Sequence, residues 1–321
     1  VLADDTTIRM CYNRIKHFEG LKKAQPITIP SAYVNKNLTS LSCVWTVLQA
    51  AKATRYSMLI NLGGGMVTDI GGFAAATFKR GINFVNVPTT LLAMVDASVG
   101  GKTGINFGGL KNEIGAFAFP KTVIIDTQWL ETLDHENLLS GYAEMLKHGL
   151  ITERKLLPTL LNFDTATFNL HQLSDMLKVS VAIKGQIVEQ DPHEQGIRKA
   201  LNFGHTFGHA FEEWAMTRHP ILHGYAVAYG IVCELYLSAI KQGFPQTIMR
   251  QTVNFIRNNY GTLPITCDDY DALISLMIHD KKNAGNDINF SLLHDLGSVV
   301  INRTATEEEI KDALDFLREG V

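Results

Sequence analysis

Short β-like runs alternate with helix-like stretches over the first 130 residues of the chain. The runs have the length and composition of strands, whereas the stretches between them repeat apolar residues at helical spacing. The predicted strands are Ile27–Ile29, Ser57–Leu62, Asn83–Val87 and Thr122–Asp126, and the predicted helices are Ser40–Ala53 and Val67–Phe78. This alternation predicts an α/β domain with a largely parallel sheet.

From about residue 131 onward the strand pattern fades, and apolar residues recur three and four positions apart. Helices are predicted at Leu138–Leu150, Leu170–Gln190, His205–Met216, Ala226–Lys241, Thr247–Asn258 and Glu307–Leu317, with one strand pair around Ile288–Leu293 and Ser298–Ile301. The sequence therefore predicts an α/β domain over residues 1–130 and a mostly helical domain over residues 131–321.

Composition narrows the range of partners. The chain has 29 Lys and Arg against 32 Asp and Glu, a formal net charge of −3. This balance gives no indication of a surface for nucleic acid or a membrane, and small-molecule partners are favoured. No apolar run reaches the ~18 residues that a membrane span needs. The four cysteines are far apart and form no C-x-x-C pair, which argues against a disulfide framework or a thiolate zinc site and fits a reducing cytoplasm.

Glycine-rich segments in the first half are candidates for ligand binding. Gly63–Gly65 follows a predicted strand and precedes a helix, an arrangement that brings backbone N–H groups to a pyrophosphate. Thr68 replaces the third glycine of the usual G-x-G-x-x-G pattern, and a tight structural turn would explain the same glycines. Thr89–Thr90 ends another strand, and Gly100–Gly101 and Gly108–Gly109 follow. Several such segments favour a backbone folded around a ligand.

Charged and imidazole side chains recur at helical spacing in the second half. Glu144 and Lys147 lie three residues apart and project from one helix face, as an ordinary solvated pair also would. His205 and His209 share a face at i and i+4, and His223 follows after a short loop. Two histidines and a carboxylate around a divalent cation form a recurring catalytic site. Spacing alone would pair His205 with His209 as ligands, although eleven histidines make a chance spacing easy.

A series of segments, taken in order, closely resembles the 3-dehydroquinate synthase family of sugar phosphate cyclases. The segments are Gly63–Gly65 with Asp69, Phe78–Gly81, Val87–Lys102, Lys111–Phe117, Gly141–Glu144, Leu201–His205 and Asp280–Lys282. The match runs from about residue 57 to 295. Each motif is weak alone, but their order and spacing together are specific. The resemblance implies a Rossmann-like NAD-binding domain followed by a mostly α-helical metal-binding domain.

The resemblance also implies a site, residue by residue. Glu144, His205 and His223 would hold a divalent metal, usually zinc and alternatively cobalt, while His209 would face the substrate or a water. The NAD site would comprise Asp4, Lys36, Gly65, Met66, Val67, Thr68, Asp69, Thr89, Thr90, Lys102, Lys111, Trp129, Leu130, Glu131 and Thr132. Substrate contacts would comprise Asp96, Lys102, Asn112, Lys147, Lys184, Arg198, Asn202 and Lys281, with Arg80 reaching in from the neighbouring subunit of a homodimer. The catalytic residues among these would be Lys147, Asn202, His209, Lys102 and Arg198.

The implied activity is the closure of a phosphorylated seven-carbon sugar acid into a carbocycle. NAD would carry a transient oxidation, and the metal would stabilise developing negative charge on oxygen. A local cluster of cations suits a substrate that bears both a phosphate and a carboxylate. A solvated surface lysine has the same appearance in the sequence, so these substrate contacts depend on the motif match.

Two positions depart from the family's pattern. Tyr33 stands where the family usually has a glutamate, three residues before Lys36, which puts a contact to the adenosine ribose in doubt. After His223 the sequence reads Gly224-Tyr225, whereas the family usually has Gly-Glu, so a carboxylate that supports the metal ligand is expected to be lost. Neither change removes a proposed metal ligand or phosphate contact.

Other functions share parts of this pattern. A related cyclase could act on another sugar phosphate, and a metal-dependent polyol dehydrogenase of the glycerol dehydrogenase type has the same two-domain layout. The polyol dehydrogenase would release NADH and would not need the anion-binding lysines. A metal-free binding protein on the same scaffold is disfavoured by the intact set of Glu144, His205 and His223.

Overall fold

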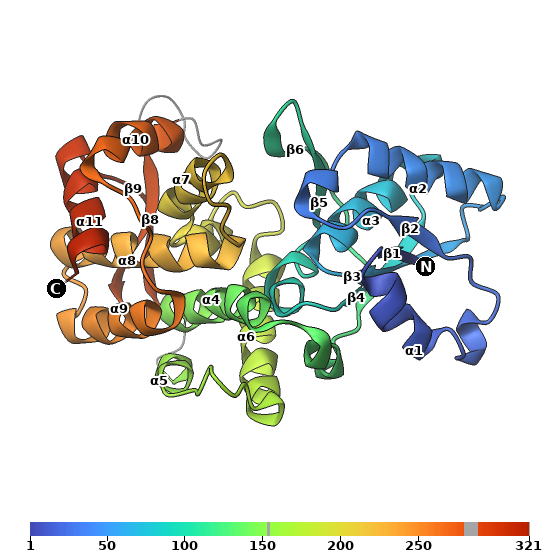
Figure 1. Ribbon diagram of the computed structural model, residues 1–321, viewed down its shortest axis with the longest axis horizontal. Coiled ribbons are helices and arrows are strands. Elements are labelled where there is room, and N and C mark those ends of the chain that lie inside the picture. Colours follow the sequence, from blue (N-terminus) through green and yellow to red (C-terminus); the bar gives the residue numbers. More distant parts are fainter. Residues whose placement is uncertain (153–154, 279–287, 321) are drawn as a thin grey trace. The chain divides into compact units, whose positions relative to one another are not determined.

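The computed structural model describes residues 1–152, 155–278 and 288–320. Its contacts divide the chain into two compact units, Val1–Asp134 and His135–Val321, each with its own secondary structure (Figure 1). Within the described ranges, no helix combines the length and the apolar character that crossing a membrane requires.

A parallel sheet forms the centre of the first unit. Its five strands lie in the order β2-β1-β3-β4-β7, and every strand pair is parallel. The strands are β1 (Leu2–Asp4), β2 (Ile27–Ile29), β3 (Met58–Gly63), β4 (Asn83–Pro88) and β7 (Thr122–Val123). The predicted α/β class and its parallel sheet are confirmed. Strand β7 is shorter than predicted, because only Thr122 and Val123 pair with β4.

Helix α2 (Leu38–Ala50) of the first unit has a side-chain cap at its N-terminus, whereas α3 (Gly65–Thr77) begins after Gly64, which has no side chain to serve as one. The side chain of Asn37 accepts a hydrogen bond from the amide of Ser40, which caps α2. Helix α3 packs closely on the sheet, since a Cβ at Gly71 would lie only 1.9 Å from Asn61 Oδ1. The α-helices are α1 (Asn13–Ile15), α2 (Leu38–Ala50) and α3 (Gly65–Thr77), with 3₁₀- or π-helical turns at Ile8–Tyr12, Glu19–Leu21, Tyr33–Asn35, Phe78–Arg80, Ala93–Ala97 and Thr127–Thr132.

An antiparallel hairpin was not predicted. Strands β5 (Lys102–Phe107) and β6 (Leu110–Phe117) pair with each other as a separate two-stranded sheet. Gly108–Gly109 joins them with positive φ angles of 59° and 86°, and no atom would contact a side chain there within 4 Å. These glycines therefore form the turn of the hairpin, and the expectation that the glycine segments fold around a ligand stays a prediction.

The second unit is mainly helical. Its helices are α4 (His135–Ile151), α5 (Leu156–Leu161), α6 (Leu170–Gln190), α7 (His205–Met216), α8 (His223–Gln242), α9 (Gln246–Tyr260), α10 (Tyr270–Ile278) and α11 (Glu307–Glu319), with shorter turns at Ile197–Asn202 and Cys267–Asp269. The predicted strand pair is present as an antiparallel hairpin of β8 (Asn289–Asp295) and β9 (Ser298–Thr304). Every helix predicted in this half has a counterpart in the structure.

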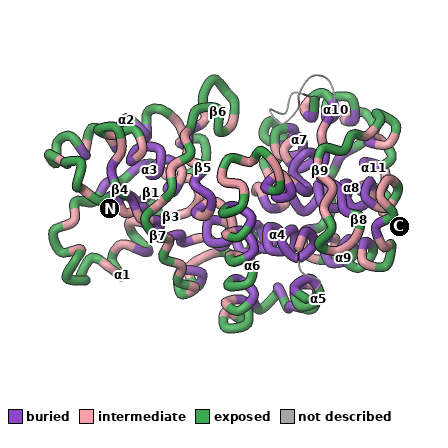
Figure 2. Tube along the Cα trace, turned by 180° about the vertical axis from the view of Figure 1, so that it is seen from behind, coloured by how far each residue is buried: buried purple, intermediate pink, exposed green. Residues whose placement is uncertain are grey.

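Helix α8 runs through the core of the second unit. It contacts α4, α7, α9, α11 and β8, and Figure 2 shows α4 and α8 as buried along most of their lengths. Glycines permit the closest approaches, because a Cβ at Gly224 would lie 1.8 Å from the carbonyl oxygen of Ser140 on α4. This packing brings the starts of α7 and α8 to the middle of α4.

Candidate active site

Helix α4 places a carboxylate and an ammonium group inside the second unit. The side chains of Glu144 and Lys147 are 0% and 1% exposed and form an ion pair, so the pair is not the solvated surface pair that spacing alone would allow. A buried carboxylate is costly unless partners compensate its charge. Glu144 therefore marks a place where several groups converge.

His205 begins α7 immediately after a left-handed glycine. Gly204 has φ 81° and forms the N-cap, which turns the chain so that the next side chain enters the interior. The Nδ1 atom of His205 lies 3.1 Å from the carbonyl oxygen of Phe203, and its Nε2 atom lies 3.3 Å from Glu144 Oε1. A hydrogen bond from Nδ1–H to the carbonyl would leave Nε2 free to bind a cation.

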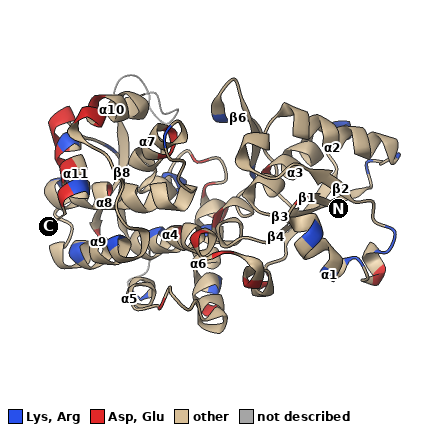
Figure 3. Ribbon diagram, in the orientation of Figure 1, with Lys and Arg blue, Asp and Glu red and all other residues tan. Residues whose placement is uncertain are grey.

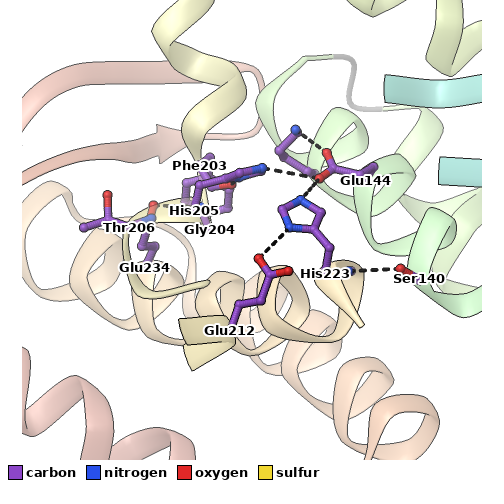
Figure 4. Close-up of polar contacts among 11 residues, drawn as sticks. Ser140, Glu144, Phe203, Gly204, His205, Thr206, Glu212, His223 and Glu234 are labelled. Atoms are coloured by element: carbon purple, nitrogen blue, oxygen red, sulfur yellow. Dashed lines mark hydrogen bonds and ion pairs between the residues drawn. The ribbon is translucent and has the colours of Figure 1, made fainter. Parts of the chain in front are cut away.

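His223 begins α8 at the same place. The amide of Gly224 donates to the hydroxyl of Ser140 at 3.1 Å, which holds the start of α8 against α4. His223 Nε2 then lies 3.5 Å from Glu144 Oε1, while its Nδ1 atom lies 3.2 Å from a carboxylate oxygen of Glu212 (Figure 4). In each imidazole, Nε2 therefore lies close to Glu144, and Nδ1 lies close to a second oxygen atom on the opposite side of the ring.

The donor atoms of Glu144, His205 and His223 fit a divalent metal. They all lie within 4.8 Å of one another. Ligands bound tetrahedrally to zinc at about 2.0–2.2 Å are separated by roughly 3.3–3.6 Å, and the two imidazole-to-carboxylate distances of 3.3 and 3.5 Å match that separation. Two histidines and a carboxylate leave further coordination positions for a substrate.

The charges in this cluster support cation binding. Burial alone would raise the pKa of Glu144, but the Lys147 ammonium and the His205 and His223 imidazoles hold that pKa well below its usual range. Burial opposes charge on His223 as well, yet the carboxylates of Glu212 and Glu144 raise its pKa to about 10. The carboxylate is therefore ionised at neutral pH, and a bound metal would displace the proton of His223.

The position of His209 differs from that suggested by its spacing. Its ring centroid lies 5.5 Å from that of His205 and 6.2 Å from that of His223, so it borders the cluster. Among the residues that the structure describes, the compact group of donor atoms contains His223 in its place. The i, i+4 spacing of His205 and His209 is therefore not what assembles the group.

Other expected substrate residues of the second unit are buried or half-buried. Lys184 on α6 is 5% exposed, and Arg198 is 2% exposed. Arg198 donates from Nη1 to the carbonyl oxygen of Pro192 at 2.6 Å, and the Nδ2 atom of Asn202 donates to Glu194 Oε1 at 2.7 Å. Lys281 lies outside the described residues.

In the first unit, the carboxyl ends of β3 and β4 bring the glycine segment and the two threonines together. The amide of Thr89 donates to the carbonyl oxygen of Gly63 at 3.0 Å. A Cβ at Gly64 would lie 3.1 Å from Thr90 Cγ2, so a larger residue would fill the cradle at the start of α3. Residues Gly65 to Asp69, including Met66, Val67 and Thr68, form the first turns of that helix. Such a strand–turn–helix junction fits a dinucleotide pyrophosphate.

Lys36 connects this helix to the hairpin. Its ammonium is buried, lies 2.5 Å from Asp69 Oδ2 on α3 and also donates to Asn112 Oδ1 on β6. Asn112 adopts a left-handed φ of 51°. The structure therefore joins two residues expected at the cofactor with one expected at the substrate.

The remaining expected residues of the first unit have separate surroundings. Asp4 Oδ1 accepts hydrogen bonds from the amides of Thr6 and Thr7 at 2.9 and 2.8 Å, which orders the turn after β1. The turn Thr127–Thr132 buries Trp129 and Leu130 and leaves Glu131 3.9 Å from Arg14, while Thr132 donates to the carbonyl of Trp129. Asp96 lies in the turn Ala93–Ala97 after β4, and Lys102 is exposed at the start of β5.

Arg80 lies on a strained turn. Lys79 and Arg80 have positive φ angles of 51° and 66°, and together with Thr54, Arg55 and Tyr56 they line an open cavity of about 440 Å³. Left-handed backbone at two successive non-glycine residues is unfavourable and persists only where the surrounding structure holds it.

Comparison with known proteins identifies the family. Residues 26–140 match the family model for the N-terminal part of 3-dehydroquinate synthase, and residues 141–283 match the model for its C-terminal part. The chain belongs to the 3-dehydroquinate synthase family. It is 52% identical over 321 residues to the 3-dehydroquinate synthase of Parabacteroides distasonis, an alignment that covers 100% of this chain and 91% of that protein.

Solved structures share the fold at low identity. A 2-epi-5-epi-valiolone synthase from Streptomyces hygroscopicus, solved with NAD+ and Zn2+, has a TM-score of 0.87 at 24% identity and covers 98% of this chain and 89% of its own. A 2-deoxy-scyllo-inosose synthase, solved with carbaglucose-6-phosphate, NAD+ and Co2+, has a TM-score of 0.85 at 23% identity and covers 100% and 89%. These likenesses confirm the fold predicted for the chain.

Tyr33 and Tyr225, the two residues that depart from the pattern of the 3-dehydroquinate synthase family, have different surroundings in the structure. Tyr33 lies beside two cations, with Lys36 Nζ 5.6 Å and Lys111 Nζ 5.2 Å from the centre of its ring. Tyr225 stacks edge-on against Tyr260 and provides no carboxylate. The expected loss of a carboxylate behind His223 is nevertheless wrong, because Glu212 supplies one from α7.

Sequence reasoning overlooked three glutamates at this site. Glu212 follows His205 by seven residues and His209 by three, so helical periodicity could have placed it on their face. No periodicity in the sequence indicated Glu194 or Glu234. Glu194 accepts a hydrogen bond from Asn202 across an irregular turn, and Glu234, in the middle of α8, accepts one from the amide of Gly204 at the start of α7. Both contacts depend on how separate elements of this family member pack.

Proposed function

We propose that this chain is a 3-dehydroquinate synthase, which converts 3-deoxy-D-arabino-heptulosonate 7-phosphate to 3-dehydroquinate and phosphate. The observation that carries the proposal is the cluster of Glu144, His205 and His223, in a chain that is 52% identical to a 3-dehydroquinate synthase over all of its 321 residues. The reaction would make the chain a phosphate-eliminating carbon–oxygen lyase of the shikimate pathway, which supplies aromatic amino acids.

We assign NAD to the first unit and a divalent metal to the second, with zinc favoured and cobalt as the other candidate. Two sugar phosphate cyclases of the same fold support this assignment, because one was solved with NAD+ and Zn2+ and the other with NAD+ and Co2+. NAD would supply a transient oxidation that acidifies the neighbouring C–H, by accepting a hydride from the carbon of a ring hydroxyl and returning it to that carbon after phosphate has left. The metal would supply Lewis acidity toward substrate oxygens.

The residues of the second unit would bind and orient the substrate. Glu144, His205 and His223 would hold the metal, and Lys147 would keep the Glu144 carboxylate ionised until the metal binds. His209, at the border of the cluster, would exchange a proton with a substrate oxygen or with a water. Lys184, Arg198 and Asn202 would fix the anionic groups of the substrate, a task that suits the fixed donor geometry of Arg198.

In the first unit, the turn after β3 would receive the pyrophosphate of NAD. The contact between the ends of β3 and β4, which brings the start of α3 close to Thr89 and Thr90, supports this role. Lys36 would hold Asp69 in position from the side of the hairpin. The remaining NAD and substrate contacts, including Lys102, Lys111 and Asp96, keep the roles that the family pattern implies.

The active form is proposed to be a cytoplasmic homodimer in which Arg80 completes the site of the partner. The strained backbone of Arg80 and its position at an open cavity support a role for this residue in the site of the neighbouring subunit. Mixing the inactive variants Arg80→Ala and Lys147→Ala tests this, since a mixed dimer would contain one doubly defective site and one intact site. Activity should rise toward half of wild type per mixed dimer. Failure to recover activity, with mixed dimers verified by mass, would show that Arg80 does not act across subunits.

One assay tests the whole proposal. The purified chain is incubated with the seven-carbon sugar phosphate, a divalent metal and catalytic NAD+, and both phosphate and dehydroquinate are followed. Stoichiometric release of the two products supports the synthase. Turnover of a different sugar phosphate with no dehydroquinate would indicate a related cyclase, and NADH accumulating in proportion to product from a polyol would indicate the dehydrogenase.

A further inference from the structure

Glu234 is a buried carboxylate that the proposed chemistry does not use. It lies in the middle of α8 and is 0% exposed. Its Oε2 atom accepts a hydrogen bond from the amide of Gly204 at 2.8 Å, and its Oε1 atom accepts one from the amide of Thr206 at 3.2 Å (Figure 4). These two amides belong to the residues on either side of His205.

The two amides are at the start of α7, where a helix has no carbonyl partners of its own for its first N–H groups. The N-cap residue is Gly204, which has no side chain to accept them. Glu234 therefore caps α7 from another helix. A negative charge at a helix N-terminus is also favoured by the helix dipole.

Glycines make this arrangement possible. A Cβ at Gly230, one turn before Glu234, would lie 1.9 Å from the carbonyl oxygen of Gly204 and 2.8 Å from the amide nitrogen of Gly208. A Cβ at Gly204 would in turn lie 2.7 Å from Ile231 Cγ1. The backbone that carries His205 is thus pressed against α8, and a local side-chain cap at Gly204 is sterically excluded.

We propose that Glu234 is a positioning residue for His205. By holding the amides before and after His205, it sets the direction in which that side chain leaves the backbone. The contact between Nδ1 and the Phe203 carbonyl then sets the rotation of the ring. Together these contacts aim Nε2 at the place where Glu144 and His223 converge. The inference rests on the metal site of the proposed function, but it concerns metal binding and not turnover.

A merely structural cap would behave differently. Loss of a structural cap lowers the stability of the fold but leaves the geometry of the remaining metal ligands unchanged. Loss of a positioning residue weakens metal binding, typically by about 10–100-fold when a group behind a ligand is removed. Stability and metal affinity must therefore be measured separately.

The test compares Glu234→Gln and Glu234→Asp with Ser238→Ala as the matched control. Ser238 is a buried polar residue one turn further along α8. Its hydroxyl accepts from the amide of Leu293 on β8 and donates to the main-chain carbonyl of Glu234, and neither of these hydrogen bonds reaches α7. The Gln variant keeps the shape but offers one acceptor for two amides. The Asp variant keeps the negative charge, but its side chain is shorter by one methylene group, so the carboxylate lies further from the two amides. This variant provides the test if the Gln variant fails to fold.

Three quantities are measured on each purified protein without substrate. They are the Tm of the metal-free chain, the dissociation constant for Co2+ from competition with a chelator, and the visible absorption spectrum of the Co2+ form. Glu234→Gln should weaken Co2+ binding about 10–100-fold and alter the spectrum, and Glu234→Asp should do so to a smaller extent. Ser238→Ala should lower the Tm while leaving affinity and spectrum unchanged.

Two results would overturn the inference, and they are distinguishable. If wild type binds Co2+ and both Glu234 variants match its affinity and spectrum while losing stability as Ser238→Ala does, Glu234 is only a structural cap. If wild type itself binds no divalent metal, the metal site of the proposed function fails, and the positioning role fails with it.

Discussion

Replacing Gly230 by alanine tests the contact between α7 and α8. The new Cβ would lie 1.9 Å from the carbonyl oxygen of Gly204, whereas ordinary contacts begin at 3.4 Å. The obstructing atoms belong to backbone, which cannot rotate away as a flexible side chain could. The start of α7, with His205 on it, would have to move by more than an ångström relative to α8.

Two opposing effects set the size of the change. Overpacking of a core costs about 1–3 kcal/mol and more where the neighbour cannot yield, so the upper end is appropriate for a backbone clash. The gain in helix propensity from Gly to Ala offsets about 1 kcal/mol. The net loss is about 2 kcal/mol, which for a unit of this size lowers the Tm by roughly 4–8 °C.

The assay is thermal unfolding of the metal-free variant beside Gly185→Ala as control. Gly185 lies within α6, and a Cβ there would meet no atom within 4 Å. That variant should therefore gain up to about 1 kcal/mol from helix propensity and unfold at a slightly higher temperature. If Gly230→Ala is as stable as Gly185→Ala, α7 and α8 are not packed as closely as the structure has them.

Further predictions concern the metal, the cofactor and one ion pair. His223→Ala should prevent stoichiometric metal binding, whereas His209→Ala should keep the metal and slow turnover; elemental analysis of the two proteins decides, and the opposite result contradicts the ligand assignment. Absorbance in the NADH band should show no net increase while phosphate accumulates, because the same cofactor is oxidised and reduced in each cycle. Lys241→Met should lower the Tm near neutral pH, since Lys241 bonds both oxygens of Glu309 in the acidic first turn of α11 (Figure 3). The hydrogen bond from Lys241 holds the pKa of Glu309 below its usual 4.5, so this stabilisation is lost as the pH falls through the lowered value, and the Tm difference from wild type should narrow in acid.

Periodicity predicted most of the secondary structure of this chain. The helices predicted at 170–190 and 205–216 agree with α6 and α7 at both ends. An apolar face that repeats at helical spacing over several turns identifies such helices clearly in the sequence. The hairpin of β5 and β6 was missed, since much of β6 is exposed and lacks the alternation of a half-buried strand. Gly108 and Gly109 form the turn between its strands, a role that the glycine pattern alone did not indicate.

The sequence by itself determined the α/β and helical halves, the family and the residue types available for a metal, because motif order and helical spacing are properties of the chain. Only the tertiary structure decided which of those residues meet. Glu144, His205 and His223 come from the middle of one helix and the starts of two others, so their convergence depends on helix packing and on the glycines that allow it. The same holds for Glu212 behind His223 and Glu234 behind the amides that flank His205. Contacts between residues far apart in the chain are set by packing geometry, which local sequence does not encode.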